Sequence, residues 1–171
     1  MFVIFVEGYY DEQFFKKFFQ NSSFRIYQYS QKKKKNINQF IKTLSCISNS
    51  DYIFITDSDG LPTNQKINLL CETYPNLSKE KISVVKYEIE SWYLAGVDES
   101  YCSKNKFEKF IFRTDTVTKE QFNNILPLYR KTRLQIMLNM LINYKIEIAK
   151  PRNDSLCDFF TEKEELVCCC F

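Results

Sequence analysis

Four short apolar runs alternate with helix-like patterns over the first 96 residues, and this alternation restricts the possible folds more than any other feature. The first run, Phe2–Val6, is rich in β-branched and aromatic residues, which is typical of a strand buried on both faces. The expected strands are 2–6, 24–29, 52–55 and 82–87, and the expected helices are about 10–20, 37–47, 64–74 and 91–95. The sequence therefore predicts an α/β fold, a Rossmann-like parallel four-stranded sheet flanked by helices.

Beyond residue 96 the pattern contains helices alone. The expected helices are 104–112, 118–126, 130–144 and 154–166. Thr118 and Gln121 have the spacing of a capping box, which marks the start of the second of these helices. We therefore expect residues 1–96 to form the α/β core and residues 97–171 to form a C-terminal helical extension packed on it.

Composition removes several classes of function. The chain of 171 residues is 44% hydrophobic and 16% aromatic, which is enough for a substantial core. It contains no histidine, which excludes histidine acid–base catalysis and Ser-His triads. The 7 cysteines form no Cys-x-x-Cys pair, so reduced thiols are expected, and the run Cys168–Cys170 is interpreted as a frayed end and not as a metal site.

Nothing in the sequence indicates a membrane or an export signal. The first apolar run is too short for a signal peptide and lacks a basic start. No apolar stretch reaches the roughly 18 residues of a membrane span. We expect a cytoplasmic protein without a membrane partner.

Acidic residues follow three of the four predicted strands. They are Glu7 after the first strand, Asp57 and Asp59 after the third, Glu88 or Glu90 after the fourth, and Asp11 in the first turn of the first helix. Parallel strands deliver their carboxyl ends to one edge of the sheet, where ligands bind in open α/β folds. Carboxylates gathered there repel one another unless a cation neutralises them, and a set of oxygen ligands suits Mg²⁺ or Mn²⁺. The pattern fits one ion as well as two.

A purely structural interpretation exists for each acid taken alone. Asp57-Ser58-Asp59-Gly60 is also an ordinary turn sequence, and Glu7 could face the dipole of a helix. The recurrence of acids at three strand ends favours the metal site over these separate explanations.

Two segments resemble the TOPRIM domain over roughly residues 1–95. They are Val6-Glu7-Gly8 with an acid at position 11, and Ile55-Thr56-Asp57-Ser58-Asp59-Gly60 at the end of a strand. The segment Ile89-Glu90-Ser91-Trp92-Tyr93-Leu94-Ala95 is similar to a motif of small stand-alone TOPRIM-like proteins, relatives of the OLD-type nucleases, and it favours Glu90 over Glu88. Arg152-Asn153-Asp154-Ser155 resembles an Arg-Asn-x-Ser segment of the same relatives.

The resemblance implies a metal-dependent nuclease that acts on DNA or RNA. It assigns Mg²⁺ or Mn²⁺ to Asp57 and Asp59, with Asp11 and Glu90 completing the ligands. Glu7 would be a ligand or a general acid or base, and Lys150 and Arg152 would stabilise the transition state. The alternative is a non-catalytic TOPRIM-like module that binds nucleic acid or a protein partner, possibly a second copy of the chain, in a defence system.

Two groups of basic residues are candidates for nucleic-acid binding. They are Lys32, Lys33, Lys34 and Lys35 in the loop before the second helix, and Arg130, Lys131 and Arg133 at the start of a helix in the extension. Clustered cations bind phosphates by releasing counterions. The four lysines also fit a solvated loop, and the net charge of +3 does not by itself indicate a polyanionic partner.

Overall fold

The structure is a computed structural model that describes residues 1–129 and 131–162. The chain divides into two compact units, which are described separately. The sheet unit comprises Met1–Val85, and the helical unit comprises the described residues from Lys86 onward.

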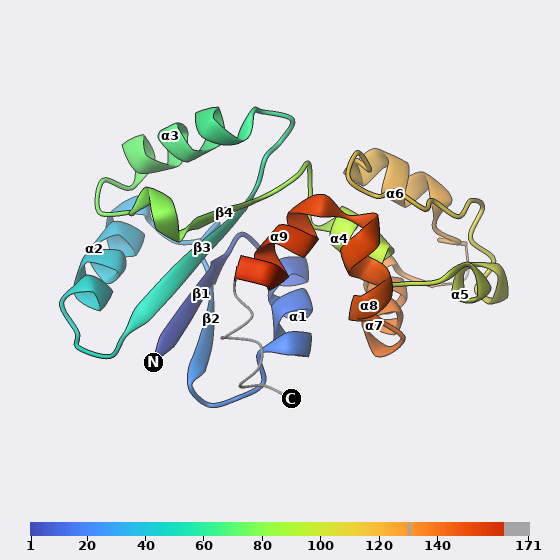
Figure 1. Cartoon of the computed structure of the whole chain (residues 1–171), viewed down its shortest axis with the longest axis horizontal. Helices are drawn as coiled ribbons and strands as arrows, with labels where there is room; N and C mark the ends of the chain where they lie inside the picture. The colour runs from blue at the N-terminus through green and yellow to red at the C-terminus, as the bar shows by residue number, and fades with distance from the viewer. Residues whose placement is uncertain (130, 163–171) are drawn as a thin grey trace. The chain divides into compact units, whose positions relative to one another are not determined.

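The sheet unit is built on four parallel strands. They are β1 (Phe2–Val6), β2 (Phe24–Gln28), β3 (Asp51–Asp57) and β4 (Ile82–Val85). Their order in the sheet is β2-β1-β3-β4, so the two most buried strands lie in the centre (Figure 1). The predicted α/β fold with a parallel four-stranded sheet is confirmed.

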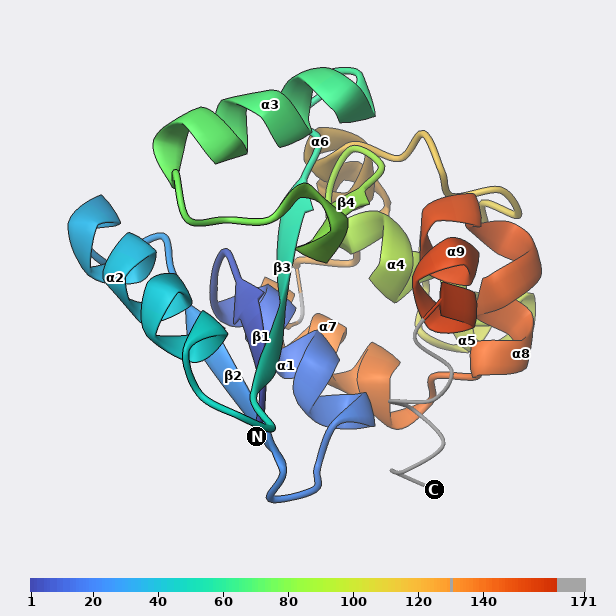
Figure 2. The same ribbon diagram turned by 60° about the vertical axis from the view of Figure 1, so that its left-hand side comes forward.

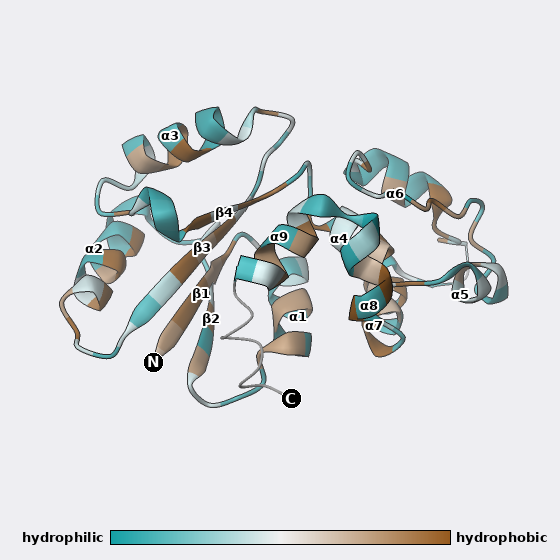
Figure 3. Ribbon diagram, viewed as in Figure 1, coloured by the Kyte–Doolittle hydropathy of each residue, from teal (hydrophilic) through white to brown (hydrophobic). Residues whose placement is uncertain are grey.

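Helices cover both faces of this sheet. They are α1 (Tyr9–Phe18), α2 (Lys34–Ser45) and α3 (Thr63–Thr73), with a short 3-10 turn, η1 (Lys79–Lys81), before β4. Figure 2 shows α2 and α3 on one side of the sheet and α1 on the other. On the first side, Phe5 and Phe54 stack with ring centroids 5.6 Å apart among apolar residues of α2 and α3. Figure 3 shows that β1 is largely hydrophobic, whereas α2 and α3 each carry both hydrophilic and hydrophobic residues, as expected for helices with one face on the core.

The helical unit contains short helices and, within the part of it that the structure describes, no strand. The elements are α4 (Glu90–Ala95), α5 (Glu99–Lys104), α6 (Lys119–Ile125), α7 (Arg133–Ile142), α8 (Ile146–Ala149), the 3-10 turn η2 (Lys150–Arg152) and α9 (Asp154–Glu162). Every residue of α4 is buried, and α4 contacts α6, α7 and α8. This packing places α4 in the helical unit, whereas the sequence analysis set the boundary after residue 96.

Predictions for the second half were less accurate. The helix predicted at 104–112 is wrong, because α5 ends at Lys104 and Lys106 has a left-handed φ of 60°. The following segment bonds to distant backbone instead, with Glu108 N–H donating to the Ile125 carbonyl at 3.1 Å. The predicted capping box of α6 is confirmed, since Gln121 N–H donates to the Thr118 hydroxyl at 3.3 Å. The predicted helix at 154–166 is present as far as Glu162, and residues 163–166 lie outside the described chain.

Candidate functional site

The carboxyl ends of β1 and β3 bring two of the predicted acids to one edge of the sheet. The strands are neighbours and run parallel, with Phe5 opposite Phe54. Glu7 follows the last residue of β1, and Asp57 is the last residue of β3. Neighbouring strands lie about 4.8 Å apart, so the backbones that carry these carboxylates are close. Both side chains are half-buried.

The two acids approach this edge from different faces of the sheet. Side chains alternate along a strand, so Glu7 continues the face of Phe5, whereas Asp57 continues the face opposite to Phe54. The sheet ends at these residues. Beyond this edge, side chains that belong to either face of the sheet can reach the same space. The site therefore lies at the edge itself and not on one face of the sheet.

Asp11 joins this region through the first turn of α1. Its side chain is buried, and its Oδ2 accepts a hydrogen bond from the N–H of Gly8 at 3.2 Å. This bond holds the carboxylate against the turn that directly follows Glu7. The acid predicted in the first turn of the helix is thus present there, with a local role in starting α1.

Tyr29, which was not predicted as a site residue, is affected by the charges of these three acids. It follows β2, its side chain is buried, and its ring stacks on Phe54 with centroids 4.4 Å apart. Its hydroxyl donates to the carbonyl of Ile55 at 3.3 Å. The sequence gives one signal for Tyr29, which is its position at the end of the predicted strand 24–29. No acid follows that strand directly.

The pKa of Tyr29 indicates how the acids are gathered. Burial raises this pKa far above its usual value, and the charges of Glu7, Asp11 and Asp57 raise it further, while a hydrogen bond with Thr56 acts in the opposite direction. Three carboxylates from three separate segments therefore act on one buried hydroxyl. This common neighbourhood is the strongest link between them.

Asp59 is arranged differently from Asp57. Its φ is +51°, its side chain is 59% exposed, and its Oδ2 lies 2.5 Å from the ammonium of Lys66 in α3. Between the two acids, the N–H of Ser58 donates to the Val85 carbonyl at 2.9 Å, which extends the pairing of β3 with β4. The left-handed turn after Ser58 thus carries Asp59 toward α3.

The predicted metal site is not a closed group of ligands. Within the described ranges, no three His, Cys, Asp or Glu side chains come together as a group that could hold a metal ion. The residues at the edge nonetheless fit a more open site, because Mg²⁺ is commonly held by one or two carboxylates, with waters and substrate phosphates completing its coordination. Glu7 and Asp57 supply oxygen ligands of that kind.

Glu90 and Arg133 form an ion pair inside the helical unit. Arg133 Nη2 donates to Glu90 Oε1, and the two side chains are 18% and 4% exposed, respectively. Glu90 was predicted to be a metal ligand and Arg133 to bind nucleic acid, and here each has the other as a partner. Glu88, the alternative to Glu90, accepts the backbone N–H of Lys119; burial raises its pKa, and so does the charge of Glu90.

Arg152 has a structural environment. It is 2% exposed, and its guanidinium donates to the carbonyls of four residues from two segments, which are Ala95, Val97, Ile111 and Phe112. The guanidinium also lies over the ring of Phe110, 4.7 Å from its centroid. These contacts give Arg152 the task of joining backbone segments, in place of the transition-state role that the resemblance implies.

The neighbours of Arg152 in the sequence have similar tasks. Asn153 donates to the hydroxyls of Thr114 and Ser91 at 3.0 and 3.3 Å, and Ser155 accepts the indole N–H of Trp92 at 2.9 Å. The Arg-Asn-x-Ser segment thus holds the helical unit together. Lys150, the other predicted catalytic cation, is half-buried at the start of η2.

The predicted basic groups differ in their surroundings. Lys32, Lys33, Lys34 and Lys35 are all exposed, but Lys34 and Lys35 belong to the first turn of α2, so the prediction that all four lie in the loop was wrong for these two. Lys131 is exposed, whereas Arg130 and the Cys168–Cys170 run lie outside the described residues.

Comparisons with protein-family models, with curated proteins and with solved structures match nothing to this chain. Among the helices that the structure describes, none has the length and apolarity needed to cross a membrane. The functional argument therefore rests on the residues at the edge of the sheet.

Proposed function

We propose that this chain hydrolyses phosphodiester bonds of DNA or RNA with the help of Mg²⁺ or Mn²⁺, through the carboxylates at the carboxyl ends of β1 and β3. The observation that carries the proposal is the placement of Glu7 and Asp57 at the carboxyl ends of neighbouring parallel strands, with Asp11 held against the turn that follows Glu7. Acids on neighbouring parallel strands are placed where open α/β sheets bind their ligands.

Glu7 and Asp57 are the residues proposed to hold the ion. A divalent ion bound there would polarise the phosphate and offset the charge of the carboxylates. Asp11 is held by the N–H of Gly8, so it supports the negative potential of the site from a fixed position. Tyr29 has a raised pKa and stays protonated at neutral pH, so its hydroxyl adds no charge to the site.

The test combines metal binding with cleavage. Purified protein is titrated with Mn²⁺ by isothermal calorimetry and then incubated with labelled single- and double-stranded DNA and RNA in Mg²⁺ or Mn²⁺. Asp57→Asn and Glu7→Gln are expected to weaken Mn²⁺ binding and to reduce cleavage about 100-fold, in the range seen when one group that stabilises the transition state electrostatically is removed from an active site.

A matched control is available on the same strand. Asp51 begins β3, at the opposite edge of the sheet, and pairs with Lys81 at 2.7 Å. Asp51→Asn makes the same chemical change as Asp57→Asn and is expected to leave metal binding and cleavage unchanged. Equal activity of the two variants, or no cleavage by the wild type with any metal and substrate, contradicts the proposal.

A second candidate is a non-catalytic module that binds nucleic acid or a protein partner. Two observations favour it: Asp59 is paired with Lys66, and the described residues contain no group of three acids that could hold an ion. This candidate predicts nucleic-acid binding that does not depend on Mn²⁺ and no cleavage. The calorimetric titration separates the two functions, since only the first requires the protein to bind the metal.

A further inference from the structure

The helical unit contains a cavity whose lining includes none of the acids discussed above. It has a volume of about 140 Å³ and lies at the end of α5, next to the segment before α7 and to α7 itself. Its walls include three lysines, Lys104, Lys106 and Lys131, and three aromatic residues, Tyr101, Phe107 and Tyr129. Cations alternate here with flat apolar rings, which is the combination that proteins use to bind single-stranded nucleic acids.

The charge around this cavity is positive. All three lysines are exposed, and none of them forms an ion pair with another described residue. The described residues that line the cavity include no Asp or Glu. Lysines gathered without acidic partners create a local potential that attracts anions.

Tyr101 supplies a polar group in the wall. The residue is 9% exposed, and its hydroxyl oxygen makes no hydrogen bond of normal geometry with another described residue, although the side chain of Asn139, which also lines the cavity, is near enough to lower its pKa. Its ring packs against Phe107 at an angle of 85°, with centroids 5.8 Å apart. Burial raises the pKa of Tyr101 to about 12, so the hydroxyl is a neutral donor at physiological pH. A buried hydroxyl without a partner costs about 1–3 kcal/mol, which a ligand could offset.

The size of the cavity restricts the ligand. Pockets for drug-sized molecules have volumes of about 300–1,000 Å³, so a cavity of about 140 Å³ admits a single small group. A single planar base enclosed by the aromatic walls, with its phosphate outside at the lysine side chains, agrees with both the volume and the charge.

We infer that this cavity binds a nucleotide, either free or as part of a single strand, with the phosphate at Lys104, Lys106 and Lys131 and the base against Tyr101 and Phe107. The inference does not depend on the carboxylate site or on a metal ion. It goes beyond the proposed function, because it assigns a recognition site to the helical unit.

The first experiment measures binding by the full chain in the presence of EDTA, which removes any contribution of metal-dependent cleavage. Fluorescence anisotropy follows labelled oligothymidylate and oligouridylate, with uridine monophosphate and inorganic phosphate as competitors. We expect saturable binding that weakens with salt. If the mononucleotide competes, a free nucleotide is enough for binding. If only an unlabelled oligonucleotide competes, a strand is required. Either result supports the inference. Absence of binding, or equal competition by inorganic phosphate and by the mononucleotide, overturns it.

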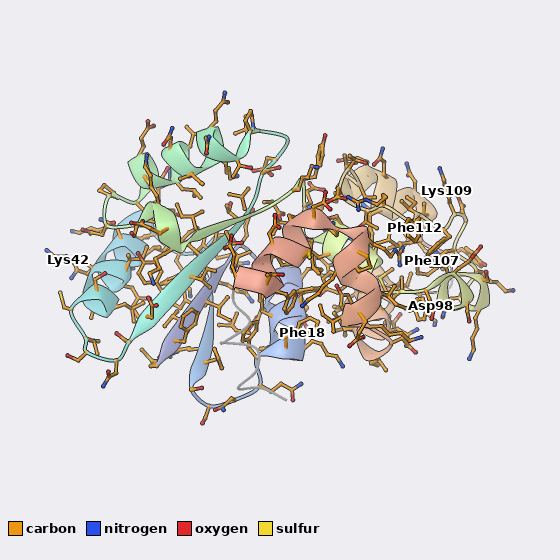
Figure 4. All side chains as sticks on the ribbon, viewed as in Figure 1. Phe18, Lys42, Asp98, Phe107, Lys109 and Phe112 are labelled. Carbon is orange, nitrogen blue, oxygen red and sulfur yellow. The ribbon has the colours of Figure 1, made fainter. Side chains whose placement is uncertain are left out.

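Charge reversal locates the site. Lys104→Glu combined with Lys106→Glu is expected to weaken binding at least tenfold and to reduce the salt dependence by about one unit per lost phosphate contact. Lys109→Glu is the matched control, because Lys109 is exposed and close in sequence but lies outside this cavity; Figure 4 labels it together with Phe107. If single Lys106→Glu and Lys109→Glu weaken binding equally, the effect comes from overall charge and the inference is overturned.

Tyr101→Phe provides a test that does not alter charge. It keeps the ring and removes the buried hydroxyl, so it is expected to weaken nucleotide binding several-fold while leaving the melting temperature unchanged or higher. A lower melting temperature with unchanged binding would assign the hydroxyl to the core and overturn its role in the site. This variant keeps the inference testable even if the double lysine variant does not fold.

Discussion

The sheet unit and the helical unit satisfy their backbone hydrogen bonds in different ways. In the sheet unit the strands pair with one another, and its helices α1, α2 and α3 are 10, 12 and 11 residues long. In the helical unit the described helices are 4 to 10 residues long, and carbonyls of the segments between them bond to the side chain of Arg152. The first unit relies on bonds between backbone groups of regular elements, and the second relies in addition on bonds from a buried side chain to distant backbone.

Because of this difference, sequence patterns predict the helices and strands of the sheet unit more accurately than the helices of the helical unit. The expected helix at 10–20 and strand at 24–29 agree with α1 and β2 to within about two residues, because apolar periodicity and backbone pairing favour the same structure there. The helix predicted at 104–112 failed because the chain turns at Lys106, whose φ is 60°, and the N–H of Glu108 bonds to the distant Ile125 carbonyl.

Replacing Arg152 with Met is expected to have the largest effect. The change leaves four carbonyls without their donor, and each buried polar group without a partner costs about 1–3 kcal/mol, so we expect a loss of more than about 3 kcal/mol in the free energy of unfolding. Urea denaturation measures the loss. Hydrogen exchange should show reduced protection in the helical unit and retained protection in β1 and β3.

Arg113→Met is the matched control for that variant. Arg113 belongs to the same unit, but its side chain is 53% exposed; it pairs with Asp154, which is 62% exposed, and with Asp115, which is 7% exposed. Exposed ion pairs contribute little, so a much smaller loss is expected. Similar losses for Arg113→Met and Arg152→Met would show that buried long-range bonds do not dominate the helical unit.

Gly96→Ala is expected to destabilise the helical unit by about 2 kcal/mol, because overpacking typically costs about 1–3 kcal/mol. A Cβ atom at Gly96 would lie 2.3 Å from the ring of Tyr144, whose hydroxyl donates to the Trp92 carbonyl at 2.9 Å. Gly8→Ala is the counterpart in the sheet unit, where the nearest atom to the new Cβ is an Asp11 oxygen at 3.8 Å. Thermal unfolding of both variants compares the two sites, and equal shifts in melting temperature would contradict the argument from Tyr144.

Thr118→Ala is expected to lower the free energy of unfolding by about 1 kcal/mol, because it removes the hydroxyl that caps α6. The comparison in the sheet unit is Thr63→Ala at the start of α3, a helix that begins without a side-chain capping bond. A near-zero change is expected there. The free energies come from urea denaturation, and a larger effect at Thr63 would reverse the expected order.

Lys33→Asp is expected to have the smallest effect and the opposite sign. Lys33 is the N-cap residue of α2 and makes no capping bond, and Lys34 and Lys35 lie in the first turn, where cations oppose the helix dipole. An Asp at this position adds a cap and a favourable charge, so we expect a gain of about 0.5–1 kcal/mol. If the lysines contact phosphates, the same variant binds nucleic acid less tightly, which anisotropy measures.

Lys42→Asp is the control for this change. Lys42 lies in the last turn of α2, where a cation is favourable, and its side chain projects outward in Figure 4. The same reversal of charge is therefore expected to destabilise the helix. If both variants shift stability in the same direction, the position along the helix is not the cause.

The candidate site was predictable in part. Sequence order placed Glu7 and Asp57 at strand ends, and parallel pairing of β1 with β3 delivers such ends to one edge. Tyr29 could not be selected, because nothing in the sequence reports that its hydroxyl faces the carbonyl of Ile55. The pairing of Asp59 with Lys66 could not be predicted either, because it depends on the left-handed turn after Ser58. Ion pairs of this kind depend on where side chains meet in space, which spacing along the chain does not give.

The sequence by itself determined the α/β class, the four strands and the acids at their ends, because a period of two or of 3.6 residues fixes which side chains can be buried together. The tertiary structure decided which polar side chains are partners. Glu90 pairs with Arg133, 43 positions away, and Arg152 bonds to carbonyls 40 to 57 positions away. Hydrogen bonds and ion pairs act over a few ångströms, so residues distant in the sequence become partners only after folding has brought them together.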